Sequence, residues 1–352
     1  AQYLDLVALG TVADVVPLDR NNRILVQQGI QRMRAGHCIP GIRALLEVGG
    51  RSLSRIVAAD LGFVVGPRLN AAGRLDDMSV GIECLLTDDA ATAEQMAARL
   101  DGLNRERKEI ESDMQARALA AIAGLKLDDE QLPVGLCLFD PDWHQGVIGI
   151  LAARIKERFH RPVIAFARSG PGELKGSARS VTGLHIRDAL DAVAACHPDL
   201  ITKFGGHAMA AGLSLPEDHY PAFAAAFDAA VSRHLSRDDL SGVIYSDGEL
   251  SEQELSLETA QLLRDASPWG QGFPAPLFEG VFNVVSHRVV GQRHLKMTLT
   301  PARGSCQIDG IAFNMEVLPG GRQQVHMAYR LDVNEFRGIV SPQLIVEHME
   351  AR

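Results

Sequence analysis

Residues 176–180 (GSARS) combine a hydroxyl and a guanidinium in a way that suits a phosphate group. Ser177 and Arg179 are two residues apart, so their side chains lie on the same side if the segment is extended. A guanidinium fork forms charge-assisted hydrogen bonds to phosphate oxygens. The segment also lies in a basic part of the chain, because residues 154–187 contain eight Arg and Lys but only two Glu. These features predict an anion-binding site at Ser177 and Arg179.

A second candidate for phosphate binding is the segment GPRLNAAGRLDD, residues 66–77. Arg68 and Arg74 flank its small residues, and Asn70 stands between them. We expect a compact loop whose backbone amides and two guanidinium groups suit phosphate oxygens. The alternative is a turn in which the arginines pair with the two aspartates that end the segment. The sequence leaves both interpretations open.

Two histidines stand beside glycines. His207 follows Gly205 and Gly206 in KFGGHAMAAG, which we expect to be a loop whose small residues allow a backbone or a ligand to approach closely. His144 precedes Gly146 in WHQGVIGI, at a predicted helix start whose free amides suit an anion. A lone histidine is more often a satisfied core residue, and glycines at a helix start often serve only close packing. Both alternatives remain open.

Asp14 is the candidate metal ligand. The segment DLVALGTVADVVPL is rich in Val and Leu and ends abruptly at Pro17, which predicts a buried strand and a turn. Asp14 would then lie at the C-terminal tip of a strand, where open α/β sheets bind ligands, and its oxygens suit a hard divalent cation. A cap or turn former is the alternative, and one carboxylate does not make a metal site. Because the chain opens on Ala1, directly before this strand, we expect it to be part of a larger protein.

These candidates need secondary structure to position them. The first 89 residues mix short apolar runs with turn signals, as in an α/β layer, and include a predicted helix that follows Asp19 and closes at Gly36. Residues 90–125 carry apolar side chains at spacings of three, four and seven. This pattern predicts a helix of about 35 residues, roughly 50 Å long, which is enough to span two domains.

The segment 126–236 predicts a second α/β domain. VGLCLFD is a predicted strand, a helix runs from near His144 to near His160, and PVIAFA is the next strand. Strand, helix and strand in this order form a parallel crossover unit. A loop containing GELKGSARS follows, then a helix, the glycine loop and an Ala-rich helix ending near Ser236.

The C-terminal part changes its periodicity. Residues 237–280 form a predicted linker with a small helix in its acidic first part. In residues 281–352 apolar side chains alternate with polar ones, which is the period of strands. About 70 residues of this kind predict a small closed or nearly closed β-barrel.

The composition limits the class of protein. With 352 residues, of which 46% are hydrophobic and 22% charged, the chain matches folded proteins of two or three domains. No apolar run approaches the roughly 18 residues of a membrane span, and the first residues, AQYLDLVALG, have neither a basic n-region nor a long apolar h-region, so we expect a cytoplasmic protein with no membrane partner. Five cysteines without C-x-x-C spacing are predicted to be reduced core thiols. The net charge of −9 argues weakly against a nucleic-acid partner, although the basic stretch is hidden in that average.

Together and in this order, these strings resemble the RecJ family of single-strand-specific 5′→3′ DNA exonucleases, within the DHH phosphoesterase superfamily. DLVALGTVADVVPLD and GPRLNAAGRLDD resemble the end of the catalytic DHH domain, while WHQGVIGI, GSARS and GGHAMAAG resemble the DHHA1 domain. SPWGQGFPAPLFEG leads into the family's oligonucleotide-binding barrel. The resemblance covers essentially the whole chain. It implies the end of a DHH-type parallel-sheet domain, a long connecting helix, an α/β DHHA1 domain and an OB-like barrel.

The resemblance also implies a function. It predicts a metal-dependent exonuclease that degrades single-stranded DNA in repair and recombination, with a pair of Mn²⁺ or Mg²⁺ ions of which Asp14 is one ligand. Ser177 and Arg179 would seat the 5′ phosphate. Phosphate positioning is implied for Arg68, Asn70, Arg74 and His207. The predicted DNA path comprises His144, Gly146, Gly205, Gly206, Arg288, Arg293, Lys296 and Arg303.

Two superfamily motifs, an Asp-rich strand motif and the Asp-His-His triplet, supply most metal ligands and are absent from these 352 residues. We expect them before Ala1, and we expect this chain alone to be inactive. Two other functions remain open, namely a catalytically silent scaffold that binds nucleic acid or replication proteins, and a phosphodiesterase for oligoribonucleotides or cyclic dinucleotides. The barrel favours a long polymer. Candidate partners are single-stranded DNA and a single-strand-binding protein or helicase.

Overall fold

Helix α7 (Ala90–Gly124) is the 35-residue helix that the sequence predicts. In the computed structural model, which describes residues 2–124, 132–236, 238–291, 294–321 and 323–352, the chain divides into two compact units. The first unit consists of residues 1–67, 84–97 and 244–352, and the second of residues 68–83 and 98–243. The start of α7 therefore belongs to the first unit and the rest of the helix to the second.

The N-terminal segment is helical, so the strand predicted over DLVALGTVADVVPL is wrong. Gly29 allows this helix to pack closely on the next one, since a Cβ atom at this position would lie 2.4 Å from the Leu4 carbonyl oxygen and 2.6 Å from the Ala8 Cβ. Two helices thus pack backbone to backbone, which an apolar run of this length allows as readily as a strand. The α-helices before α7 are α1 (Leu4–Ala13), α2 (Arg20–Arg34), α3 (Pro40–Val48), α4 (Ala58–Asp60), α5 (Gly66–Leu75) and α6 (Ser79–Leu86).

The segment SPWGQGFPAP packs on the start of α2 within the first unit. The Leu18 backbone N–H donates to the Gln271 carbonyl oxygen at 2.6 Å. Trp269 and Phe273 stack with ring centroids 5.1 Å apart, and the Arg23 guanidinium lies 3.8 Å from the Phe273 ring centroid. This stack of two rings and a cation joins segments far apart in the sequence.

The predicted barrel is present in the first unit and is closed. Leu295, Met297 and Leu299 are buried in its core, and the alternate residues Lys296 and Thr298 are partly exposed, which is the predicted period of two. Helix α11 (Leu257–Ala266) is the small helix predicted in the acidic segment, and it contacts β9. The strands follow one another around the barrel as β10 (Ile339–Ala351), β8 (Ile308–Ala312), β7 (His294–Pro301), β6 (Phe278–Val290) and β9 (Gln324–Phe336).

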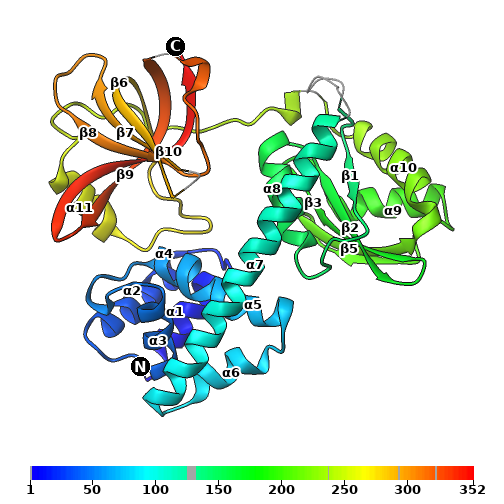
Figure 1. Ribbon diagram of the computed structural model, residues 1–352, viewed down its shortest axis with the longest axis horizontal. Coiled ribbons are helices and arrows are strands. Elements are labelled where there is room, and N and C mark those ends of the chain that lie inside the picture. The colour runs from blue at the N-terminus through cyan, green and yellow to red at the C-terminus, as the bar shows by residue number, and fades with distance from the viewer. Residues whose placement is uncertain (1, 125–131, 237, 292–293, 322) are drawn as a thin grey trace. The chain divides into compact units, whose positions relative to one another are not determined.

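The second unit contains a five-stranded sheet between two layers of helices (Figure 1). Strands β1 and β2 are parallel and joined through α8, as predicted, whereas the other pairs are antiparallel. The order across the sheet is β1 (Leu136–Phe139), β2 (Val163–Gly170), β3 (Glu173–Arg179), β5 (Ala210–Pro216) and β4 (Lys203–Gly206). Its helices are α8 (Ile148–Phe159), α9 (Ile186–Cys196) and α10 (Tyr220–Ser232).

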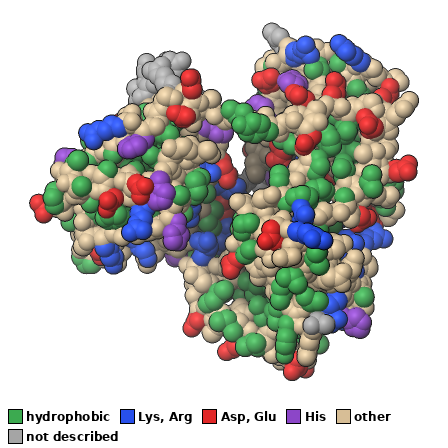
Figure 2. All heavy atoms as spheres, turned by 180° about the vertical axis from the view of Figure 1, so that it is seen from behind, with side chains coloured by type: hydrophobic (Ala, Val, Ile, Leu, Met, Phe, Trp, Pro, Cys, Tyr) green, Lys and Arg blue, Asp and Glu red, His purple; other side chains and the backbone are tan. Residues whose placement is uncertain are grey.

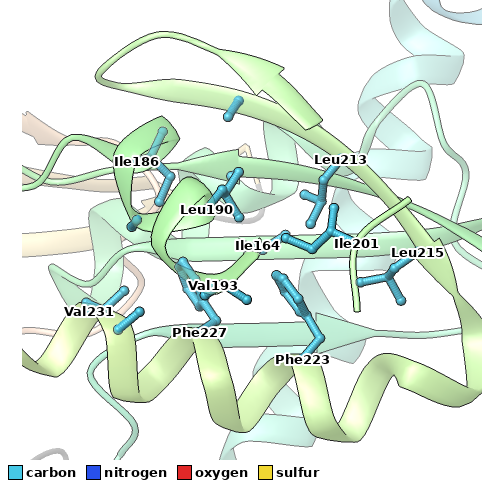
Figure 3. Packing of buried hydrophobic residues seen from close by; sticks show 14 of the residues in the cluster. Ile164, Ile186, Leu190, Val193, Ile201, Leu213, Leu215, Phe223, Phe227 and Val231 are labelled. Atoms are coloured by element: carbon cyan, nitrogen blue, oxygen red, sulfur yellow. The ribbon is translucent and has the colours of Figure 1, made fainter. Parts of the chain in front are cut away.

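Strand β2 shows how the two layers are divided. Val163 and Ala165 pack in the cluster that contains α7 and α8, while Ile164 and Phe166 pack in the cluster that contains α9 and α10. The face of the sheet that carries Val163 is therefore the α8 face. Figure 3 shows the opposite core, formed by Ile164, Ile186, Leu190, Val193, Ile201, Leu213, Leu215, Phe223, Phe227 and Val231.

Three segments predicted as loops are regular structure. GPRLNAAGRLDD contains the whole of α5, GELKGSARS lies mainly in β3, and KFGGHAMAAG forms β4 and the start of β5 around a tight turn. Some of their small residues serve close packing, and others, such as Gly206, serve turns. A Cβ atom at Gly176 would lie 2.6 Å from the Phe166 ring and 2.7 Å from Leu213, so only glycine fits this position in β3.

The surface of the N-terminal helices exposes hydrophobic side chains among charged ones, as Figure 2 shows in the lower part of the view. Within the described ranges, no helix combines the length and the apolar character needed to cross a membrane. All five cysteines are free thiols. The prediction of core thiols holds for Cys84, which is buried, and is wrong for Cys196, which is exposed.

Candidate functional site

Ser177 and Arg179 lie side by side on β3, as their spacing predicts for an extended segment. The Arg179 Nη1 atom donates to the Ser177 Oγ at 3.1 Å and to the Ala178 carbonyl oxygen at 2.8 Å. In the ladder with β2, Ser177 pairs with Ala165 and Arg179 with Val163, so both side chains are on the α8 face of the sheet. The hydroxyl and the guanidinium are thus held by regular structure and not by a loop.

The N-terminus of α8 meets these two side chains. A Cβ atom at Gly149 would lie 2.8 Å from the Arg179 Nη2 and 2.9 Å from the Ser177 Oγ, so glycine is needed for this approach. The helix begins at Ile148, somewhat later than predicted, and its N-cap Val147 gives no side-chain cap. The first amides of a helix lack intrahelical acceptors and carry the positive end of the helix dipole. A hydroxyl, a guanidinium and a helix N-terminus therefore converge at one place.

Arg74 joins this place from α5. Its Nη1 atom donates to the Gly146 carbonyl oxygen at 3.1 Å, in the loop that leads into α8. A Cβ atom at Gly146 would lie 2.4 Å from the Arg74 carbonyl oxygen, so α5 and this loop approach at backbone distance. The sequence places these two segments some 70 residues apart, and the structure brings them together.

The guanidinium groups of Arg74 and Arg179 repel each other. Burial lowers the pKa of Arg179, and the charge of Arg74 lowers it further. Burial also lowers the pKa of Arg74, together with the charge of Arg107 and against the attraction of Glu111. Among the described residues, no carboxylate forms an ion pair with Arg74 or Arg179. Like charges held together with no carboxylate in direct contact are favourable sites for an anion.

Arg107 and Glu111 are residues of this neighbourhood that sequence reasoning missed. They pair at 2.7 Å on α7, and Arg107 is almost completely buried. Glu111 also accepts from the Arg154 Nε at 3.2 Å. In the sequence this pair shows only as an arginine and a glutamate four residues apart among many other charged residues. Such spacing is common on solvated helices and does not single the pair out.

Arg68 and Asn70 are placed differently from Arg74. The Arg68 Nη2 lies 2.8 Å from the Asp101 Oδ1, and Asp101 also accepts from Arg105, so Arg68 is held in a largely buried ion pair. Asn70 is exposed on α5, one turn before Arg74. The alternative pairing of the arginines with the aspartates that end their segment is not what the structure shows, since Asp76 pairs with Arg99.

His207 lies in the turn between β4 and β5. Gly206 has a φ of 149°, and a Cβ atom there would lie 2.4 Å from the Ala210 carbonyl oxygen, so the turn requires glycine. The His207 N–H donates to the Ala210 carbonyl oxygen at 2.8 Å, and Ala210 pairs with Arg179 in the ladder of β5 and β3. His207 and Gly205 are exposed beside the end of β3 that carries Arg179.

His144 is exposed in the loop before α8, and its Nδ1 accepts from the Gly146 N–H at 3.1 Å. This bond assigns the proton of a neutral ring to Nε2, leaving a donor toward solvent.

Asp14 follows α1 as its C-cap and is exposed, so its predicted place at a strand tip is wrong. No group of three or more His, Cys, Asp or Glu side chains that could hold a metal occurs in the part of the chain that the structure describes. These residues on their own do not form a metal site.

The predicted cations of the barrel are partly engaged. Arg288 is exposed and pairs across the strands with Lys296, whose ammonium lies 3.0 Å from the Asp309 carboxylate. Arg303 is exposed beyond β7. Arg293 lies outside the described residues.

Comparisons with known proteins identify two of the domains. A model of the DHHA1 domain matches residues 117–233, and a model of the RecJ OB domain matches residues 246–348. The single-stranded-DNA-specific exonuclease RecJ of Dickeya dadantii is 58% identical over 352 residues, which are 99% of this chain and 61% of that protein. The chain is thus similar to RecJ exonucleases along almost its whole length. The RecJ of Escherichia coli K12 is 56% identical with the same shares covered.

A solved RecJ structure shares the fold of the whole chain. The RecJ of Thermus thermophilus in complex with Mg²⁺ superposes with a TM-score of 0.79 at 30% identity, covering 100% of this chain and 52% of that one. A second structure of that protein, in complex with Mn²⁺, has a TM-score of 0.78. The chain thus spans 61% of the length of the RecJ proteins of Dickeya dadantii and Escherichia coli and about half of this solved one.

Proposed function

We propose that this chain supplies the strand-binding half of a metal-dependent 5′→3′ exonuclease acting on single-stranded DNA in repair and recombination. One observation carries the proposal, namely the convergence of Ser177, Arg179 and Arg74 on the N-terminus of α8. A terminal phosphate bears about one more negative charge than an internal phosphodiester at neutral pH, as its second pKa near 6 implies. Guanidinium groups that form no ion pair with a carboxylate should therefore bind a terminal phosphate more tightly than an internal one.

Holding the 5′ end explains the direction of digestion. A strand fixed by its terminal phosphate presents the same linkage to the reacting groups at each step. Ser177 and Arg179 would bind the phosphate, and Arg74 would approach it from α5. His207 would lie beside the DNA where it passes the end of β3. These groups position the strand and stabilise negative charge, which is a large part of catalysis in phosphoryl transfer.

The metal part of the proposal rests on the relatives. The solved RecJ structures from Thermus thermophilus contain Mg²⁺ or Mn²⁺. Such ions, when bound, activate water and neutralise the charge that develops on phosphate oxygens. Asp14 would contribute one carboxylate, and we propose that further ligands lie in the part of the relatives that this chain does not cover.

The barrel would follow the strand beyond the site through Arg288 and its neighbouring cations. A single-strand-binding protein or a helicase as partner, and a cytoplasmic location, belong to the same proposal. Binding without catalysis is the second candidate function of this chain, and it is favoured by the absence of a metal-binding group among the described residues.

The test is binding by the 352-residue chain. Fluorescence anisotropy with oligonucleotides labelled at the 3′ end compares single strands that carry a 5′ phosphate, a 5′ hydroxyl or a phosphate only at the 3′ end. We expect the 5′-phosphorylated DNA to bind most tightly, a blunt duplex to bind weakly, and no hydrolysis in Mn²⁺. Equal affinity for the 5′-phosphorylated and 5′-hydroxyl strands would refute the proposed 5′-phosphate site. Rapid hydrolysis would refute the proposal that most metal ligands lie outside this chain.

A further inference from the structure

The α8 face of the sheet is open next to the candidate site. Helix α8 packs on β2 and β3, and α9 packs on β4 and β5 from the opposite face. On the α8 face, Gly205, Ala210 and Gly212 are all exposed. A Cβ atom at Gly205 would meet nothing within 4 Å, and one at Gly212 would meet only the Gly176 carbonyl oxygen at 3.9 Å. Gly205, Ala210 and Gly212 form an exposed surface, here called the glycine surface, on which an extended ligand could lie.

The strand register orders this face into rows. Arg179 pairs with Ala210 at one end. The next row on the same face contains Ser177, Gly212 and Gly205, and the row after it contains Lys175, Ser214 and Lys203. Residues two apart in an antiparallel strand are about 6.8 Å apart, so the lysine row lies about 14 Å along β3 from Arg179.

Two exposed ammonium groups stand at that distance. Lys175 and Lys203 are both exposed and flank Ser214 from neighbouring strands. Among the described residues neither lysine forms an ion pair with a carboxylate. Glu173, two residues before Lys175 on β3, accepts a hydrogen bond from the Ser169 hydroxyl at 3.1 Å. The lysine row thus places two positive charges at the end of the glycine surface that lies away from Arg179.

We propose that Lys175 and Lys203 bind an internal phosphate of the strand whose 5′ end lies at Ser177 and Arg179. The inference rests on the proposed function and adds a second phosphate subsite to it. A lysine is a point charge on a flexible stem, which suits an internal phosphate whose position varies with the base sequence, whereas the fork of Arg179 suits a fixed terminal phosphate. The glycine surface lies between Arg179 and the two lysines, so the DNA backbone could pass over it without meeting a long side chain.

The experiment neutralises phosphates one at a time. A series of 5′-phosphorylated DNA strands, each with a methylphosphonate at a different linkage, is titrated into the 352-residue chain and into Lys175→Gln/Lys203→Gln. For the unsubstituted chain we expect affinity to fall at a linkage within the first few from the 5′ end. For the double variant we expect no further loss at that linkage.

The salt dependence gives the magnitude. Each phosphate contact to a single strand contributes about 0.7 to the slope of log affinity against log salt, so the double variant, which loses one such contact, should lose about 0.7 of slope. With affinity at 1 M salt unchanged, this corresponds to about 5-fold weaker binding at 0.1 M. The control is Arg187→Gln/Arg233→Gln, which removes two exposed cations from α9 and from the end of α10 on the opposite face.

The outcomes separate the two proposals. In the double lysine variant the preference for a 5′ phosphate over a 5′ hydroxyl should remain as in the unsubstituted chain. If the lysine variant responds to every methylphosphonate as the unsubstituted chain does, or matches the α9 and α10 control in its salt slope, the second subsite is refuted and the 5′ site stands. If the unsubstituted chain shows no 5′-phosphate preference, the proposed function fails and the subsite with it.

Discussion

Replacing Arg179 with alanine should weaken recognition of a 5′ phosphate without destabilising the fold. One charge-assisted hydrogen bond contributes about 1.5–3 kcal/mol, so the ratio of Kd for the 5′-hydroxyl strand to that for the 5′-phosphorylated strand should fall by about 10- to 150-fold. The free energy of unfolding of the Arg179→Ala variant, by contrast, should be unchanged or higher. Burial and the charge of Arg74 lower the pKa of Arg179, which means that its charged form is less favourable in the folded than in the unfolded chain.

The two readouts together test this role of Arg179. Anisotropy titrations give the ratio of the two Kd values, and thermal unfolding without DNA gives Tm. Arg179→Lys keeps the charge and loses the fork, so its ratio should be intermediate. Arg187→Gln, on the opposite face of the sheet, should change neither quantity. An Arg179→Ala variant with a lower Tm and an unchanged ratio would show that Arg179 stabilises the fold and does not bind the strand.

Other variants probe neighbouring features. Gly149→Ala should reduce the 5′-phosphate preference in the same titration while Tm stays level, because the added methyl group displaces the Arg179 guanidinium; an unchanged preference would remove the α8 terminus from the site. Burial opposes ionisation of Asp101, but Arg105 and Arg68 outweigh it and lower its pKa below the ordinary 3.8, so its stabilisation is present above that pH and is lost as pH falls further. Asp101→Asn should therefore cost about 3–5 kcal/mol of unfolding free energy at pH 7, and the difference from the unsubstituted chain should shrink below about pH 4 in urea titrations. In a full-length relative, replacing the residue equivalent to Asp14 with Asn should abolish nuclease turnover and spare DNA binding, and normal turnover would exclude it as a metal ligand. Arg288→Glu should weaken binding of long single strands more than short ones, and equal weakening would argue against a role of the barrel in following the strand.

Periodicity and capping predict the elements that are long or clearly bounded. The 35 residues of α7 and the helix after Asp19 follow from spacing and from a capping side chain, and Asp19 accepts from the Asn22 N–H as such a cap does. The alternation of Leu295, Met297 and Leu299 predicts the barrel for the same reason. These signals are local, so one sequence is sufficient to detect them.

Contacts between distant segments decide what the sequence alone does not. The first helix was predicted as a strand because a short apolar run fits either element, and its close packing on Gly29 in the next helix cannot be read from its own residues. The small residues near Gly176 and Gly206 indicate turns, but at Gly176 the packing of Phe166 requires glycine within a strand. The partner of Arg68 is Asp101, 33 residues away, whereas two aspartates within its own segment looked equally suitable. Ser177 and Arg179 were predictable because both the pair and its geometry lie within one short strand.

The stack of Trp269, Phe273 and Arg23 has a consequence for the order of synthesis. Leu18 and Gln271 bond to each other across about 250 residues of sequence, so the start of α2 is translated long before the segment that covers it. At about 5–20 residues per second, that surface waits about 12–50 s on the ribosome for its partner. During this interval Leu18, which is buried in the finished protein, is exposed to the solvent and to any chaperone that binds apolar segments. These helices are thus translated long before the segment that completes their packing.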